Sequence, residues 1–146
     1  MGIAALISWI VTALGGSYML AKWVAGGGHH GQNTKLSPSM VFGHFLSAAV
    51  GLLIWIAYLV TGNPAVAAAA SLVLLLVATL GFIMLARWAA TYYARQAVTE
   101  GAQPKTVGTP AEPEQSFPVA VVLLHGLLAV TTVTLVLFAL FPLFSL

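Results

Sequence analysis

Four long apolar runs, separated by short polar stretches, dominate the chain. They cover residues 3–24, 39–60, 65–88 and 118–140. A helix needs about 20 apolar residues to cross a bilayer, and each run is near or above that length. The pattern predicts an all-α protein: a transmembrane up-down four-helix bundle that forms a single domain over residues 1–146.

Proline and glycine mark the expected helix ends. Pro38 and Pro118 open the second and fourth helices, where the missing proline N–H costs nothing. Gly62-Asn63-Pro64 predicts a tight turn between the second and third helices. We expect the first and third connections to be polar and mobile, because one is rich in glycine and the other in proline. These connections run over 26–37 and 96–116.

The chain holds only five basic and three acidic residues among 146, and 60% of its residues are hydrophobic. This balance excludes a water-soluble domain and is too sparse in charge for a nucleic-acid surface. All the basic residues fall at the same ends of the helices: Lys22, Lys35, Arg87, Arg95 and Lys105. The positive-inside rule then predicts a multi-pass protein of the plasma (inner) membrane, with loops 26–38 and 89–117 cytoplasmic and both termini outside. Aromatic residues at this edge are expected to anchor the helices at the membrane interface: Trp23, Trp88, Tyr92 and Tyr93.

The first and third helices carry similar sequences. Residues 16–25 match residues 81–90 at a constant spacing of 65, and Met-Leu-Ala-(Lys/Arg)-Trp occurs in both. A shorter match aligns the residues that follow His44 and His125. We interpret the chain as two repeated helical hairpins, 1–61 and 65–141, related by a pseudo-two-fold axis along the membrane normal. Chance resemblance between apolar segments is the alternative.

Histidine carries most of the chemical information, because without cysteine a metal ion would need histidine, methionine or oxygen ligands. His44 and His125 fall inside the spans, each about 9–10 Å beyond its helix-opening proline. They therefore share one layer. Ionisable groups inside a membrane are rare and usually functional. His29 and His30 lie in a glycine-rich loop, and we expect them to be solvated.

The second and fourth helices are diagonal in an up-down bundle, about 13 Å apart, whereas neighbours pack at 8–10 Å. That gap leaves room for a flat macrocycle between opposed imidazoles, and histidine is an established axial ligand of haem iron. We therefore predict that His44 and His125 bind the metal of one haem b. The porphyrin would lie against small residues at the same level: Gly16, Gly81, Ala48 and Ala129. Its propionates would be reached by two basic residues, Lys22 and Arg87. Alternatively, the small residues serve helix packing and the basic ones reach lipid headgroups.

A four-helix membrane bundle with His44 and His125 on diagonal helices resembles small membrane b-type cytochromes of the cytochrome b561-like type. The resemblance implies haem b and electron exchange with a quinone or a redox partner subunit, without a catalytic residue on this chain. Di-haem members use four membrane histidines, whereas this chain has two within its spans, so at most one bis-histidine haem is expected. Two alternatives stay open: a non-catalytic accessory subunit of a larger membrane complex, and a small proton or metal transporter. A homo-oligomer is compatible with each.

Overall fold

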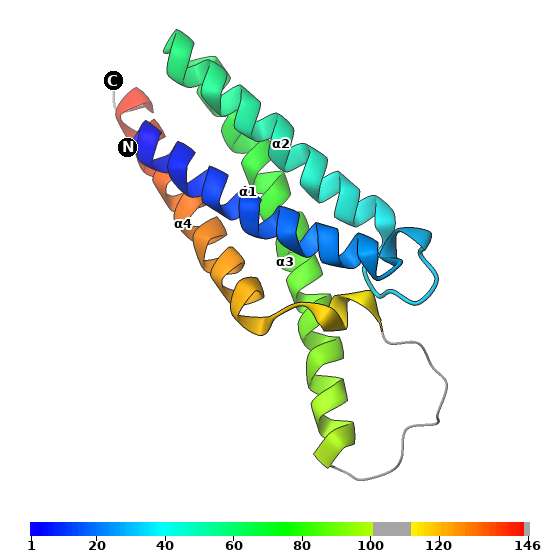
Figure 1. The fold of residues 1–146 in the computed structure, drawn as a ribbon. Coiled ribbons are helices and arrows are strands. Elements are labelled where there is room, and N and C mark those ends of the chain that lie inside the picture. Colours follow the sequence, from blue (N-terminus) through cyan, green and yellow to red (C-terminus); the bar gives the residue numbers. More distant parts are fainter. Residues whose placement is uncertain (101–111, 145–146) are drawn as a thin grey trace.

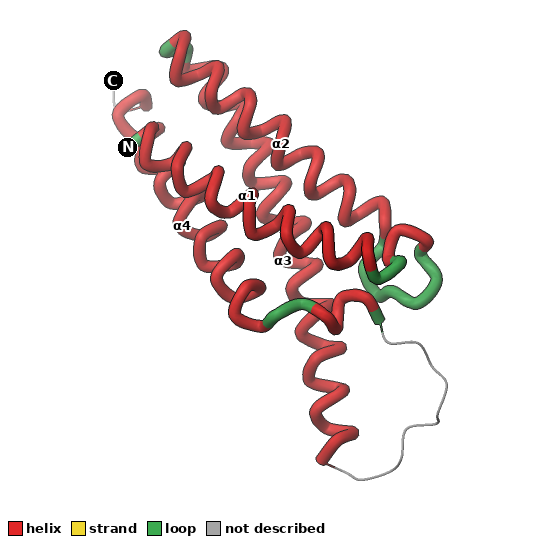
Figure 2. Tube along the Cα trace, viewed as in Figure 1, coloured by secondary structure: helices red, strands yellow, loops and turns green. Residues whose placement is uncertain are grey.

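The computed structural model describes residues 1–100 and 112–144, and every regular element in these two ranges is a helix. The four long helices are α1 (Gly2–Ala25), α2 (Pro38–Thr61), α3 (Pro64–Glu100) and α4 (Val119–Phe144). Two short 3-10 helices, η1 (Gly28–His30) and η2 (Pro113–Ser116), lie in the first and third connections. The four helices run alternately up and down (Figures 1 and 2). The all-α, four-helix prediction is confirmed.

Each long helix packs on two neighbours. α1 and α3 both contact α2 and α4, and the most extensive contacts are those of α2 with α3 and of α1 with α4. α2 and α4 are therefore diagonal, as the sequence predicts, and so are α1 and α3. The two helices that carry His44 and His125 face each other across the bundle.

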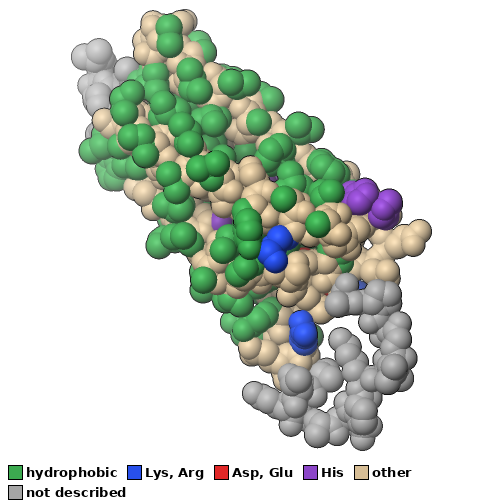
Figure 3. Space-filling view, viewed as in Figure 1, with side chains coloured by type: hydrophobic (Ala, Val, Ile, Leu, Met, Phe, Trp, Pro, Cys, Tyr) green, Lys and Arg blue, Asp and Glu red, His purple; other side chains and the backbone are tan. Residues whose placement is uncertain are grey.

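All four helices are long and apolar enough to cross a membrane. Each one exposes large aliphatic side chains, for example Ile3, Leu53, Leu72 and Leu127, which are 62%, 66%, 69% and 65% exposed. Apolar side chains cover the helices, and basic ones lie toward the loop end (Figure 3). Because this much apolar surface is unfavourable in water, the chain is a multi-pass membrane protein.

The turn between α2 and α3 forms as predicted. α2 begins at Pro38 after Ser37 and ends at Thr61. Gly62 follows it, with a φ of +65°, the left-handed conformation that favours glycine. The Oδ1 of Asn63 then accepts a hydrogen bond from the N–H of Ala65 at 2.9 Å. This bond satisfies a free N–H at the start of α3.

The third helix is longer than predicted. The sequence prediction ends it at residue 88, whereas α3 continues to Glu100, so residues 89–100 are not a loop. The reason is that this segment contains neither proline nor glycine and includes several good helix formers. The rest of the predicted loop up to residue 111, including Lys105, lies outside the described residues.

The end of the third connection is also more ordered than predicted. Residues 113–116 form η2, which packs against α1 and α3. Glu114 is fully buried there, because its carboxylate accepts hydrogen bonds from the first connection. This part of the segment is polar, as expected, but it forms a short helix with a buried carboxylate.

The two tryptophans at the loop end are buried inside the protein, so the prediction that they are lipid anchors is wrong. Trp23 is 1% exposed and packs with Leu36, and its Nε1–H donates to the Oγ1 of Thr34 at 3.1 Å. Trp88 is 7% exposed and stacks on Tyr92, with ring centroids 5.4 Å apart. The first connection folds back over the Trp23 indole and removes it from the membrane interface.

The apolar core is divided into two clusters along the bundle axis. The larger cluster lies toward the termini: Ala5, Trp9, Trp55, Ala67, Ala70, Leu74, Val136 and Leu140. The smaller lies at the loop end: Trp23, Leu36 and Val41. The membrane histidines occupy the layer between these clusters.

Candidate functional site

Each membrane histidine is held by a backbone carbonyl of a neighbouring helix. The Nδ1 of His44, on α2, lies 3.0 Å from the carbonyl oxygen of Val77 on α3. The Nδ1 of His125, on α4, lies 2.9 Å from the carbonyl oxygen of Thr12 on α1. A carbonyl oxygen only accepts, so each ring carries its hydrogen on Nδ1. The Nε2 lone pair of each neutral imidazole is then available to a metal ion.

The two imidazoles lie close together, although their helices are diagonal. Their centroids are 6.5 Å apart and their planes are inclined by 65°. Ring atoms lie about 1.1 Å from an imidazole centroid and metal–nitrogen bonds are about 2.0 Å long, so two collinear imidazoles on one metal ion have centroids about 6.3 Å apart. The observed spacing fits that arrangement. It also falls within the range of an edge-to-face contact between two rings.

Gly16 and Gly81 lie directly against the imidazoles. A Cβ atom at Gly81 would be 3.0 Å from Cε1 of His44, and a Cβ at Gly16 would be 3.0 Å from Cε1 of His125. These separations are shorter than the ordinary carbon–carbon contact of about 3.5–4.0 Å. The prediction that two histidines and two glycines share one level is confirmed. The glycines contact the imidazole rings themselves, a contact that the sequence did not predict.

No side chain in the layer around the histidines is fully buried. Each helix contributes a stretch of nine or ten residues in which every residue is half-buried or exposed: 13–22, 42–50, 78–87 and 123–131. At 1.5 Å per residue this layer is about 14 Å tall. The two core clusters lie above and below this layer. Within it, the closest contacts are those of the imidazoles with Gly16 and Gly81.

The other predicted site residues lie in or beside this layer. Ala48 and Ala129 are half-buried, one turn beyond His44 and His125. At the loop end, Nζ of Lys22 lies 5.8 Å from the centroid of the Tyr18 ring. The guanidinium of Arg87, also at the loop end, donates through Nη1 to the carbonyl of Lys35 at 3.4 Å.

Three hydroxyl groups lie beside the His125 layer, and sequence reasoning missed them as a cluster. The Oγ atoms of Ser8 and Thr132 are 2.8 Å apart, and the Oγ1 atoms of Thr12 and Thr132 are 3.4 Å apart. Ser8 and Thr12 are four residues apart and so lie on one helical face, a spacing that could have been noticed. Thr12 belongs both to this cluster and to the carbonyl contact of His125.

In the described part of the chain, no group of three or more histidine, cysteine, aspartate or glutamate side chains could hold a metal ion. A metal on His44 and His125 would therefore have no further histidine, cysteine or carboxylate ligand from the described residues. His29 and His30 are exposed at the loop end, as predicted, with ring centroids 3.9 Å apart.

Comparison of the chain with family models, with curated proteins and with solved structures finds no match. The fold and the site define the class: a multi-pass, four-helix membrane protein with a histidine pair between diagonal helices. The contacts of that pair are the basis for a functional assignment.

Proposed function

We propose that the protein is a membrane b-type cytochrome in which His44 and His125 are the axial ligands of one haem b. The observation that carries the proposal is the pair of imidazoles, with centroids 6.5 Å apart, in a layer where no side chain is fully buried. Both rings donate Nδ1–H to a backbone carbonyl. Bonds of this kind orient metal-ligating histidines and fix which nitrogen faces the metal.

An accessory, non-catalytic subunit is the second candidate. It is favoured by one specific observation: both imidazoles already hydrogen-bond across helices, which stabilises helix packing in a membrane. Helix packing alone, however, does not explain why two imidazoles meet between diagonal helices in a layer without a fully buried side chain.

A small proton or metal transporter is less well supported. Two histidines provide only two ligands, and the three acidic residues of the chain all lie outside the apolar spans, at positions 100, 112 and 114. Transport sites in membranes usually combine several polar or ionisable groups near the midplane.

The remaining site residues have separate roles in the proposal. Gly16 and Gly81 allow the imidazoles to stand against α1 and α3, and Ala48 and Ala129 leave space for the macrocycle. Basic side chains at the loop end would pair with the propionates: Lys22 and Arg87. These two residues would have to leave their present contacts, which are weak, to do so.

Haem b supplies a one-electron iron couple, whose potential depends on the axial ligands and the surrounding protein. The larger apolar cluster fills the bundle between the histidine layer and the termini. A single haem in this layer would therefore exchange electrons at the loop end, with a quinone or a partner subunit. One chain would not carry an electron across the ~30 Å of the hydrocarbon region.

The two hairpins are, in this proposal, copies of one ancestral hairpin. Matched contacts support it: the carbonyls that accept from the histidines belong to Thr12 and Val77, which are 65 positions apart, as are Gly16 and Gly81. Matched burial supports it as well. In α1 and α3, buried residues recur at the spacing of 65: Ala5 with Ala70, and Trp23 with Trp88. In α2 and α4, where His44 and His125 are 81 positions apart, buried Val41 and Val122 have that same spacing of 81.

We also propose that the loop end faces the cytoplasm and that the membrane is the plasma membrane. Four basic residues of the described chain lie at that end: Lys22, Lys35, Arg87 and Arg95. The positive-inside rule supports this orientation. The chain contains no cysteine, so single cysteines introduced at Gly62 or His30 would report the sidedness through a membrane-impermeant thiol reagent.

The test is a visible spectrum of the detergent-purified chain, produced with ample haem. The wild-type protein is expected to bind one haem per chain and to give a sharp Soret band that shifts on reduction with dithionite. His44→Ala and His125→Ala are expected to lose this spectrum. The control is the double variant of His29 and His30 to alanine, which should keep it. A folded, colourless wild-type protein would remove the haem proposal, and persistent co-purification with a larger complex would then favour the accessory role.

A further inference from the structure

Glu114 is a buried carboxylate that the proposed haem chemistry does not use. Its side chain, in η2, has 0% exposure. One carboxylate oxygen accepts a hydrogen bond from the Oγ1 of Thr34 at 2.8 Å, and the other accepts from the backbone N–H of Lys35. No lysine or arginine of the described ranges lies within ion-pair distance of this carboxylate. Hydrogen bonds alone hold it, and burying a charge in this way is costly unless the bonds are well made.

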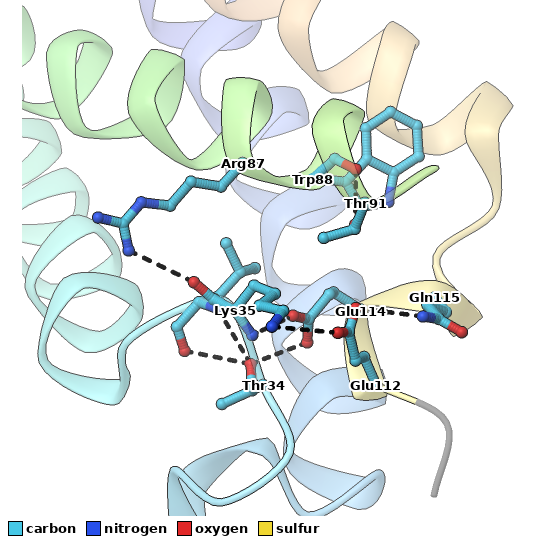
Figure 4. Close-up of polar contacts among 9 residues, drawn as sticks. Thr34, Lys35, Arg87, Trp88, Thr91, Glu112, Glu114 and Gln115 are labelled. Carbon is cyan, nitrogen blue, oxygen red and sulfur yellow. Dashed lines mark hydrogen bonds and ion pairs between the residues drawn. The ribbon is translucent and has the colours of Figure 1, made fainter. Parts of the chain in front are cut away.

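Thr34 connects Glu114 to the rest of the loop end (Figure 4). The hydroxyl of Thr34 donates to Glu114 and accepts from two N–H groups, those of the Trp23 indole and the Leu36 backbone, each at 3.1 Å. The hydroxyl thereby uses its donor and both of its lone pairs. We call the contact of Glu114 with Thr34 and Lys35 the loop latch.

The loop latch joins the starts of the two helices that carry the membrane histidines. Lys35 is three residues before Pro38, where α2 begins, and Glu114 is five residues before Val119, where α4 begins. α2 and α4 are diagonal and pack on α1 and α3, with little direct contact between them. The latch is thus a direct tie between them.

The histidines lie close to this tie. His44 follows the first residue of α2 by six positions, and His125 follows the first residue of α4 by six positions, a distance of about 9 Å along each helix. A change in the separation of the helix starts would therefore be transmitted to the two imidazoles. The neighbouring Glu112 differs: among the described residues, its carboxylate meets only the exposed Nζ of Lys35, at 3.8 Å, and the amide of Gln115.

We infer that Glu114 is a positioning residue that sets the separation of His44 and His125. The inference rests in part on the proposed function, because the consequence of that separation is whether two imidazoles can ligate one iron. Loss of the carboxylate leaves the Lys35 N–H without its acceptor and removes the nearer of two acceptors of the Thr34 hydroxyl, the other being the Leu36 carbonyl at 3.2 Å. The starts of α2 and α4 are then free to move apart.

The first experiment measures the helix separation and needs no haem. Cysteines replace Leu46 and Leu127, which are exposed, lie two residues after each histidine, and can be spin-labelled without removing any native cysteine. In the haem-free protein we expect a narrow distance distribution that broadens in Glu114→Ala. Glu112→Ala is the matched control and should leave the distribution unchanged. If Glu114→Ala does not fold, Thr34→Val removes one latch bond while keeping the side-chain size, and it should broaden the distribution to a smaller extent.

The second experiment measures axial ligation in the haem-loaded protein. Carbon monoxide binds ferrous haem only when an axial imidazole leaves, so its binding rate reports ligand separation. We expect the rate to rise about tenfold in Glu114→Ala, in line with the loss of hydrogen bonds to a charged group, and to stay unchanged in Glu112→Ala.

The outcomes separate the two claims. An unchanged distance distribution in Glu114→Ala and Thr34→Val overturns the positioning role, whether or not haem binds. A broadened distribution in a protein that binds no haem supports the latch as a tie between α2 and α4, and it overturns the cytochrome proposal alone.

Discussion

Gly81 offers a sharp test of how tightly the imidazoles are fitted to the bundle. An alanine there would place its Cβ 3.0 Å from Cε1 of His44. Because carbon atoms make favourable contact at about 3.5–4.0 Å, the ring would have to move by roughly 0.5–1 Å. The ring is also held to α3 by the bond from Nδ1 to the carbonyl of Val77, at 3.0 Å, one turn before Gly81.

The expected penalty falls on haem binding and spares folding. In the haem-free protein the His44 ring can swing away from the new methyl group, and replacing glycine by alanine within a helix stabilises the fold by about 0.5–1 kcal/mol. In the haem-bound protein an iron–nitrogen bond and the Val77 carbonyl would both hold the ring. Overpacking costs about 1–3 kcal/mol, so the dissociation constant of haem should rise about tenfold, since 1.4 kcal/mol corresponds to a factor of ten.

The assay is a spectrophotometric haem titration of the detergent-solubilised apoprotein, paired with thermal unfolding. Gly43 is the matched control, because it precedes His44 in the chain and a Cβ there would meet nothing within 4 Å. Gly43→Ala should gain the same helix stability without losing affinity. Gly16→Ala should repeat the Gly81→Ala result at His125, where the same 3.0 Å contact occurs.

Two results would refute this reasoning. If Gly81→Ala binds haem as tightly as the wild type, the ring is not confined as described. If Gly43→Ala loses as much affinity as Gly81→Ala, the effect comes from general disturbance of the helices.

Three further predictions concern folding. Gly28→Ala would place a Cβ in collision with the Trp23 ring, so it should destabilise the protein by about 3 kcal/mol and shift the tryptophan emission. Unchanged melting and emission would contradict the packing of the first loop on Trp23. Thr132→Val removes the hydroxyl that contacts both Ser8 and Thr12, and it should lower the free energy of unfolding by about 1–2 kcal/mol in a thermal melt. The control Thr131→Val, at an exposed position, should lower it little. Equal losses of stability in the two variants would argue against the hydroxyl cluster. An alanine at position 62 must adopt a φ of +65°, so Gly62→Ala should lower the free energy of unfolding by about 1–2 kcal/mol in the same assay, and Gly62→Asn should lower it less. Equal and negligible losses of stability in both variants would mean that the turn does not hold this conformation.

The fold was predictable because the signals that fix it are local. An apolar run of spanning length must form a helix in lipid, and Pro38 and the Gly62-Asn63-Pro64 turn mark ends that need no knowledge of the rest of the chain. Where prediction failed, the decisive contacts were distant in sequence. Trp23 is buried because Thr34 and Leu36 fold over it, and Glu114 is buried because a loop about 80 residues earlier supplies its hydrogen bonds.

The candidate site was predictable only in its side chains. The positions of His44, His125, Gly16 and Gly81 follow from helix registers, and the structure brings these four together. Their anchors are backbone carbonyls, which carry no signature of their own in a sequence. The repeat spacing of 65, applied to one carbonyl once it was known, would have located the other.

The most direct test of the central claim is electron paramagnetic resonance of the oxidised, purified protein. Two imidazoles on one ferric iron give a low-spin signal, and planes inclined by 65° should make that signal strongly anisotropic. We expect this signal in the wild type and its replacement by a high-spin signal, or its loss, in His44→Ala and in His125→Ala. A wild-type protein whose haem is high-spin, or whose low-spin signal survives removal of either histidine, would contradict it.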